Sequence, residues 1–193
     1  RAQARPLRPR RPPAPRVPSP EELDRAARRA PAIVWSAAPS FALLPATGGA
    51  LWGAGASLGF GALGASESVF ARWLAGPTDT STLRWFEVGL ALDYRVPLHR
   101  SVRLVLSGDA SLAFLRLPEA RATGGVMGAR DALSGRAGGA LGLEVRAFGP
   151  AWASLRLSPG AVLLRTSFED ATGRRGAVEG FWLGVDLGLH IEH

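Results

Sequence analysis

The sequence has no cysteine and no lysine, and it contains one methionine and three histidines. Without cysteine, neither a disulfide framework nor a thiolate metal site can form. No apolar run reaches the ~20 residues that a transmembrane helix needs, which excludes a helical membrane protein. The spacing of His99, His190 and His193 predicts no shared metal site in an extended chain. We therefore expect no cofactor and no bound metal.

Positive charge is concentrated at the start of the chain. Residues 1–31 contain nine arginines and three acids, and so carry +6 of the formal net charge of +7. Residues 1–20 also hold seven prolines, a composition that favours open, extended conformations. We predict a disordered basic tether over residues 1–31, in which residues 20–29 could form a short helix. Because the chain begins at Arg1 and not at methionine, we expect an export signal upstream.

The tether is a candidate contact for a cell-wall polymer or another envelope protein. Its arginines attract anionic partners, but no aromatic side chains are interleaved among them. Single-stranded nucleic acid is usually held by such aromatic side chains. We therefore predict no nucleic acid among the partners.

From Ala32 onward the chain alternates between apolar and polar or small residues. The clearest segment runs from Phe181 to His193, where every odd position from 181 to 191 is large and apolar. A period of two predicts an extended strand whose two faces meet different surroundings. Eight segments follow this pattern, over residues 33–44, 51–60, 66–75, 83–96, 102–115, 136–147, 152–165 and 178–192. The third is the weakest, because Phe70 and Leu74 interrupt its polar face.

The connections between these segments alternate in length. Residues 61–65, 97–100 and 148–151 are tight, residues 45–50 and 77–82 are looser, and residues 118–133 and 167–177 are long. Short turns at one end and longer loops at the other are typical of outer-membrane barrels. The pattern predicts an all-β domain over residues 32–193, an eight-stranded antiparallel up-and-down transmembrane β-barrel. The long segment 118–133, with Glu119, Arg121, Arg130 and Asp131, is the candidate contact surface for outside partners.

The apolar face is predicted to point outward, into lipid. The apolar rows are long enough to cross a bilayer at a tilt, and the opposite face is rich in small residues that suit a narrow lumen. Aromatic residues also lie near strand ends, where we expect interfacial girdles that include Trp152 and Trp182. The predicted lipid-facing residues are Phe86, Leu90, Leu92, Leu104, Leu112, Leu141, Leu155, Leu183, Val185, Leu187 and Leu189.

The polar face then becomes a lumen filled with ion pairs. Buried charges must be paired, and the signs on this face are balanced. The predicted network consists of Glu87, Asp93, Arg95, Arg103, Asp109, Arg136, Glu144, Arg146, Arg156 and Asp186. Within neighbouring strands we expect Asp93 to lie diagonal to Arg103, and Glu144 diagonal to Arg156. A lumen of this kind is plugged.

Residues 32–193 resemble the small eight-stranded bacterial outer-membrane β-barrels of the OmpA and OmpX type. That family ends in a strand with alternating apolar residues, which Val185, Leu187, Leu189 and Ile191 match; His193 stands where the family has an aromatic residue. The resemblance implies a porin-like meander barrel in the outer membrane of a Gram-negative bacterium, with periplasmic termini. It implies no ligand and no catalytic residue.

The predicted role is non-enzymatic. His190 lies on the inward face and no serine is evident as its partner, so we expect no catalytic site. We expect a monomer in the lipid bilayer with a structural, anchoring or surface-interaction role. One alternative is a narrow outer-membrane channel for small solutes. A second is a soluble, lipocalin-like ligand-binding barrel, in which the apolar face points inward.

Overall fold

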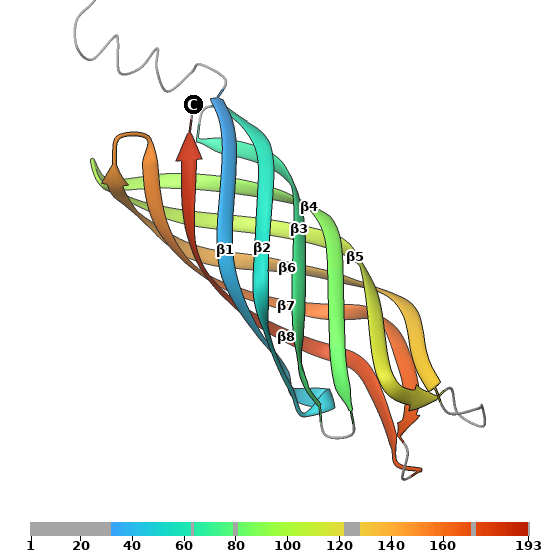
Figure 1. Cartoon of the computed structure of the whole chain (residues 1–193). Coiled ribbons are helices and arrows are strands. Elements are labelled where there is room, and N and C mark those ends of the chain that lie inside the picture. The colour runs from blue at the N-terminus through green and yellow to red at the C-terminus, as the bar shows by residue number, and fades with distance from the viewer. Residues whose placement is uncertain (1–31, 63, 79–80, 122–127, 171–172, 193) are drawn as a thin grey trace, which may run out of the picture.

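A computed structural model describes residues 32–62, 64–78, 81–121, 128–170 and 173–192, which form one closed barrel (Figure 1). The predicted tether, the helix over residues 20–29 and His193 lie outside the described residues. The strands are β1 (Ala32–Leu44), β2 (Gly49–Ala62), β3 (Ala65–Pro77), β4 (Thr82–His99), β5 (Val102–Arg121), β6 (Gly128–Phe148), β7 (Ala151–Asp170) and β8 (Arg175–Glu192), and one 3-10 turn, η1 (Pro45–Thr47), follows β1. None of the described residues belongs to a helix long and apolar enough to span a membrane.

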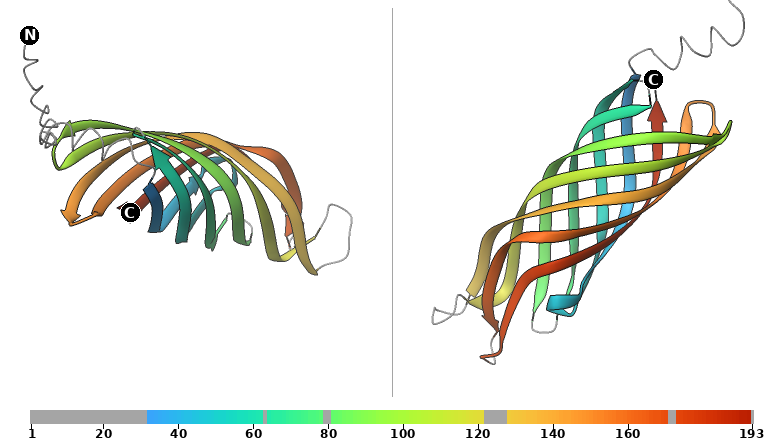
Figure 2. Two further views of the ribbon diagram at one scale, coloured as in Figure 1. Left: turned by 90° about the horizontal axis from the view of Figure 1, so that it is seen from above. Right: turned by 180° about the vertical axis from the view of Figure 1, so that it is seen from behind.

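Each strand pairs antiparallel with its neighbour in the sequence, and β1 pairs with β8 to close the ring. Strands on opposite walls of the barrel cross at an oblique angle, as expected for tilted barrel strands (Figure 2). Closure leaves no sheet edge with unpaired backbone groups. The predicted fold class, an eight-stranded antiparallel up-and-down barrel, is confirmed.

The two ends of the barrel differ in their connections. At the tight-turn end, two residues join β2 to β3, β4 to β5 and β6 to β7, and this end also holds the start of β1 and the end of β8. At the opposite end, called the loop end below, four residues separate β1 from β2 and β7 from β8. The short connections therefore lie together at one end of the barrel, as predicted.

The two long loops predicted over residues 118–133 and 167–177 are wrong in extent. β5 continues to Arg121 and β6 begins at Gly128, while β7 and β8 reach Asp170 and Arg175. β5 even pairs directly with β7 at its last two residues, which narrows the loop end. The strands continue because polar side chains can pair across them as apolar ones do, for example Arg116 opposite Asp131.

Glycines on the inner face of β2 allow β3 to approach closely. A Cβ atom added at Gly53 would lie 1.9 Å from the carbonyl oxygen of Trp73 in β3, which no side chain tolerates without a backbone shift. We expect Gly53→Ala to lower the free energy of unfolding by about 1–3 kcal/mol, as overpacking does.

The Gly53→Ala effect can be measured by urea unfolding in lipid vesicles, followed by tryptophan fluorescence. Gly108→Ala is the matched control, because a Cβ atom at Gly108 meets nothing within 4 Å. Equal stabilities of the two variants would contradict the close approach of β2 and β3.

Candidate functional site: the charged lumen

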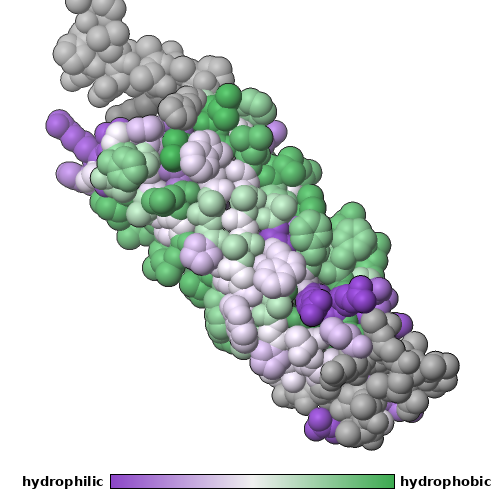
Figure 3. Space-filling view, viewed as in Figure 1, coloured by the Kyte–Doolittle hydropathy of each residue, from purple (hydrophilic) through white to green (hydrophobic). Residues whose placement is uncertain are grey.

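The outer surface of the barrel is apolar over its middle part. Eight of the residues predicted to face lipid are between 42% and 65% exposed: Phe86, Leu90, Leu92, Leu112, Leu141, Leu155, Leu187 and Leu189. Leu104, Leu183 and Val185 are half-buried among them. Figure 3 displays this surface as green patches on the flanks of the visible face. Water-soluble proteins rarely expose so large an apolar surface, so the soluble lipocalin-like alternative is not favoured.

At the loop end, the interior of the barrel is filled with apolar side chains. We call this group the apolar plug; it consists of Ala42, Leu44, Leu51, Leu74, Leu83, Trp85, Ala113, Leu115, Leu117, Val162, Phe168, Val178 and Trp182. The rings of Trp85 and Trp182 lie 5.2 Å apart at its inner end. Trp182 was predicted in an interfacial girdle, and this prediction is wrong, because its side chain is fully buried inside the barrel.

Below the plug, Glu87 is the centre of a buried cluster of charges. Its Oε1 lies 2.8 Å from Nε of Arg72, and its Oε2 lies 3.4 Å from Nε of Arg136. The indole nitrogen of Trp85 and the hydroxyl of Ser111 each donate a hydrogen bond of 3.0 Å to the same Oε2. The side chains of Glu87 and Arg136 are fully buried. Two guanidinium groups and two neutral donors therefore compensate one buried carboxylate.

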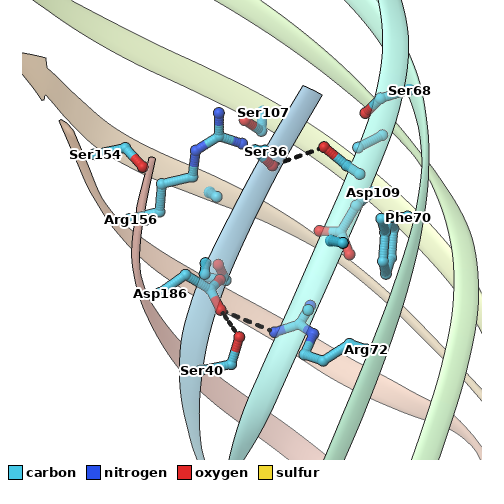
Figure 4. A pocket seen from close by; sticks show the side chains of 18 of the residues that line it. Ser36, Ser40, Ser68, Phe70, Arg72, Ser107, Asp109, Ser154, Arg156 and Asp186 are labelled. Atoms are coloured by element: carbon cyan, nitrogen blue, oxygen red, sulfur yellow. Dashed lines mark hydrogen bonds and ion pairs between the residues drawn. The ribbon is translucent and has the colours of Figure 1, made fainter. Parts of the chain in front are cut away.

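This cluster continues into two further carboxylates. Arg136 also bonds Asp109, and Arg72 Nη1 lies 3.5 Å from Asp186, which accepts a hydrogen bond from Ser40 (Figure 4). Arg72 was not among the predicted lumen residues. The apolar neighbours Phe70 and Leu74 had concealed its inward position in the sequence.

Nearer the tight-turn end, four charged residues form a closed ring of alternating sign. Arg95 lies 3.2 Å from Asp93 and 3.3 Å from Glu144, and Arg156 lies 3.2 Å from Asp93 and 3.3 Å from Glu144. The ring joins β4, β6 and β7 across the lumen. The predicted diagonal pair of Glu144 with Arg156 is present in it.

The predicted pair of Asp93 with Arg103 is wrong. In the register of β4 and β5, Asp93 lies opposite Ser107, which donates a hydrogen bond to it, and Arg103 lies further toward the turn. Arg103 instead donates two hydrogen bonds, of 2.6 and 2.9 Å, to Glu192 at the end of β8. The predicted turn at residues 97–100 is shorter in the structure, because β4 continues to His99, and Arg103 therefore pairs with Pro97.

At the tight-turn end, the structure differs from two further predictions. Arg146, predicted in the lumen network, is exposed and lies 5.4 Å from the ring of Trp152. Trp152, predicted in an interfacial girdle, is buried, and the Arg103 guanidinium stacks over its ring at 3.4 Å. Trp152 therefore fills the narrow interior at this end, where the guanidinium of Arg103 covers its face.

A cavity of about 110 Å³ lies between the two charged clusters, against β1, β2 and β8 (Figure 4). Its wall includes seven serines, Ser36, Ser40, Ser57, Ser68, Ser107, Ser154 and Ser158, together with the charged residues Arg72, Asp93, Asp109, Arg156 and Asp186. A space of this volume is large enough for several water molecules. Gly55 of β2 and Gly188 of β8, which have no side chains, are part of its wall.

The described part of the lumen shows no cluster of metal ligands. Among the described residues, no group of three or more His, Asp or Glu side chains could hold a metal ion. His190 is buried beside Arg95 and Glu192, 3.5 and 3.2 Å away, so its ring lies in the ion-pair network. The interior is built from ion pairs, hydroxyls and apolar side chains.

Comparisons with known proteins agree with this geometry at the level of fold. No protein-family model matches the sequence, and no curated protein is detectably similar to it. Among solved structures, Neisserial surface protein A is 12% identical, with a TM-score of 0.61 over 83% of this chain and 96% of that chain. A major outer membrane protein from Thermus thermophilus is 13% identical, with a TM-score of 0.57 over 86% of this chain and 100% of that chain.

This chain has the fold of an outer-membrane β-barrel. The suspected OmpA-like resemblance is thereby confirmed for the fold of residues 32–193. At 12–13% identity, the likeness extends to the fold alone and carries no ligand or partner to this chain.

Proposed function

We propose that this protein is an integral protein of the bacterial outer membrane with a non-enzymatic role and an occluded lumen. The apolar outer surface supports membrane insertion, since side chains such as Leu90 and Leu187 would otherwise be exposed to water. The solved barrels with the same fold come from outer membranes, which supports the location. We propose that the barrel is a monomeric anchor that displays its loop end and connects its N-terminal tether to the envelope.

The main observation in support of an occluded lumen is the apolar plug, which lies between the Glu87 cluster and the loop end. Trp85, Trp182 and the leucines around them are almost completely buried, and a hydrated ion would have to displace them. The charged residues below the plug are held by one another and by hydrogen bonds. The second candidate, a narrow channel, is favoured by the polar cavity, but the plug lies between that cavity and the loop end.

Membrane insertion is tested first, by fractionation and by gel mobility of unheated and heated samples. We expect the protein in the outer-membrane fraction, with a folded form that migrates differently from the heat-unfolded form. A protein that remained in the aqueous fraction and never folded in detergent would contradict both the anchor and the channel.

Conductance in planar bilayers separates the two membrane roles. For the wild-type barrel we expect no steady conductance above that of the protein-free bilayer, because the plug excludes water and ions. A known open porin, inserted under the same conditions, is the positive control. Steady single-channel currents from this protein would overturn the occluded lumen and favour the channel.

A further inference from the structure

On the outer surface of five neighbouring strands, the apolar residues are replaced by charged residues toward the loop end. From β4 to β8, a large exposed apolar residue is followed toward the loop end, two positions away on the same face, by a charged one. The five pairs are Phe86 with Arg84, Phe114 with Arg116, Leu133 with Asp131, Leu163 with Arg165, and Phe181 with Glu179. Apolar and aromatic bands end in this way where a barrel leaves the hydrocarbon layer. Figure 3 displays hydrophilic side chains gathered below the green surface toward the loop end.

Within this row, Arg84 and Arg116 lie directly opposite each other on β4 and β5. Two like charges in a cross-strand pair repel each other unless an anion lies between them. Elsewhere in the row the charges are compensated, since Arg165 lies 3.0 Å from Glu179. Arg84 and Arg116 share one carboxylate of the row, Asp131, which lies 3.8 Å from Arg116, so this part of the row keeps a net positive charge.

Among the described residues, one carboxylate, that of Asp131, lies near this pair. On the β3 side, Arg84 lies opposite Ala75, and among the described residues no Asp or Glu side chain forms a salt bridge with it. Arg116 has Asp131 at 3.8 Å, which is longer than a hydrogen bond, and its side chain is 57% exposed. Arg84 thus has no carboxylate partner among the described residues, and the one long contact of Arg116 leaves the rest of its exposed guanidinium available to an external anion.

We propose that Arg84 and Arg116 bind the phosphate group of a membrane lipid in the leaflet at the loop end of the barrel. Two guanidinium groups suit a phosphate because each presents paired N–H donors to its oxygens. Phe86 and Phe114 are opposite each other in the same register, one step closer to the apolar surface. They lie where the acyl chains of a lipid bound through its phosphate would begin.

This inference rests on the proposed membrane location and adds a lipid class to it. In the outer membrane, the outward leaflet carries phosphorylated glycolipid, so diphosphoryl lipid A is the probe. The full chain, folded in uncharged maltoside micelles, is titrated with lipid A and with the same lipid after removal of its phosphates. Native mass spectrometry counts the bound lipids and yields the apparent dissociation constants.

We expect the wild type to prefer the phosphorylated lipid, and the double variant R84Q/R116Q to bind it at least about tenfold more weakly. The variant R146Q is the matched control, because Arg146 is also exposed but lies at the opposite, tight-turn end. It should retain wild-type affinity. Inorganic phosphate at millimolar concentration should not displace the lipid if the aromatic pair also contacts it.

The outcomes separate this inference from the proposed function. Equal binding of both lipids by a folded wild-type barrel, or wild-type affinity in R84Q/R116Q, overturns the phosphate site and leaves the membrane location intact. Displacement by inorganic phosphate alone shows an anion site and overturns the lipid. A chain that never folds in micelles contradicts the membrane location and the lipid site together.

Discussion

Replacement of Glu87 by alanine is expected to lower the free energy of unfolding by about 3–5 kcal/mol, the usual cost of breaking a buried ion pair from one side. The change leaves Arg72 and Arg136 close together without their shared carboxylate, and both side chains are at least nine-tenths buried. It also removes the acceptor for Trp85 and Ser111. Urea unfolding in lipid vesicles, followed by tryptophan fluorescence, measures the loss.

Two further variants serve as controls for the Glu87 result. Glu179→Ala removes an exposed carboxylate that pairs with Arg165, and we expect a loss of about 0–1 kcal/mol. Glu87→Gln retains the shape and an acceptor oxygen, so the difference between the two Glu87 variants isolates the contribution of the charge. A loss in Glu87→Ala no larger than that in Glu179→Ala would contradict a buried cluster centred on this residue.

The fold was predictable because alternation is a local signal. In a strand, the face of each residue depends only on whether its position is odd or even, so Phe86, Leu90 and Leu187 could be assigned to the outer surface one strand at a time. Tight connections then implied antiparallel neighbours and a meander. No long-range information was needed for either step.

The partners within the lumen could not be predicted in the same way. Arg156 and Asp93 are 63 positions apart, and they meet only because the barrel closes and brings β7 to face β4. The pairing of Asp93 with Arg103 was inferred from a turn at residues 97–100, but β4 continues to His99, which places Asp93 opposite Ser107. The side chains that cross a lumen depend on the register of every strand between them.

Other lumen residues were missed because the whole lumen was assumed to be polar. We expected a uniformly polar lumen, so Leu74 and Phe70 looked like breaks in the inner face of β3 and Arg72 was passed over. In fact Leu74 belongs to the apolar plug, and the interior changes from apolar to charged along its axis. Trp152 and Trp182 were assigned to the interface for the same reason, although the odd–even pattern places both inside.

The orientation of the two faces predicts a large effect for a charge placed on the outer surface of β8. Leu187 is 57% exposed and lies opposite Leu155, which is also exposed, in the middle of the apolar surface. Leu187→Arg should lower the free energy of unfolding in vesicles by about 2–4 kcal/mol, the cost of arginine near the bilayer midplane. Urea unfolding in vesicles measures it, and the fraction of protein that folds into vesicles should fall in parallel.

Position along the membrane normal, and not the charge itself, should determine this cost. Phe148→Arg is the matched control, because Phe148 is 69% exposed and lies beside the tight turn, where arginine costs about 0–1 kcal/mol at an interface. In a barrel whose outer surface faced water, both substitutions would be nearly neutral. Tolerance of arginine at Leu187 would therefore contradict the proposed membrane location.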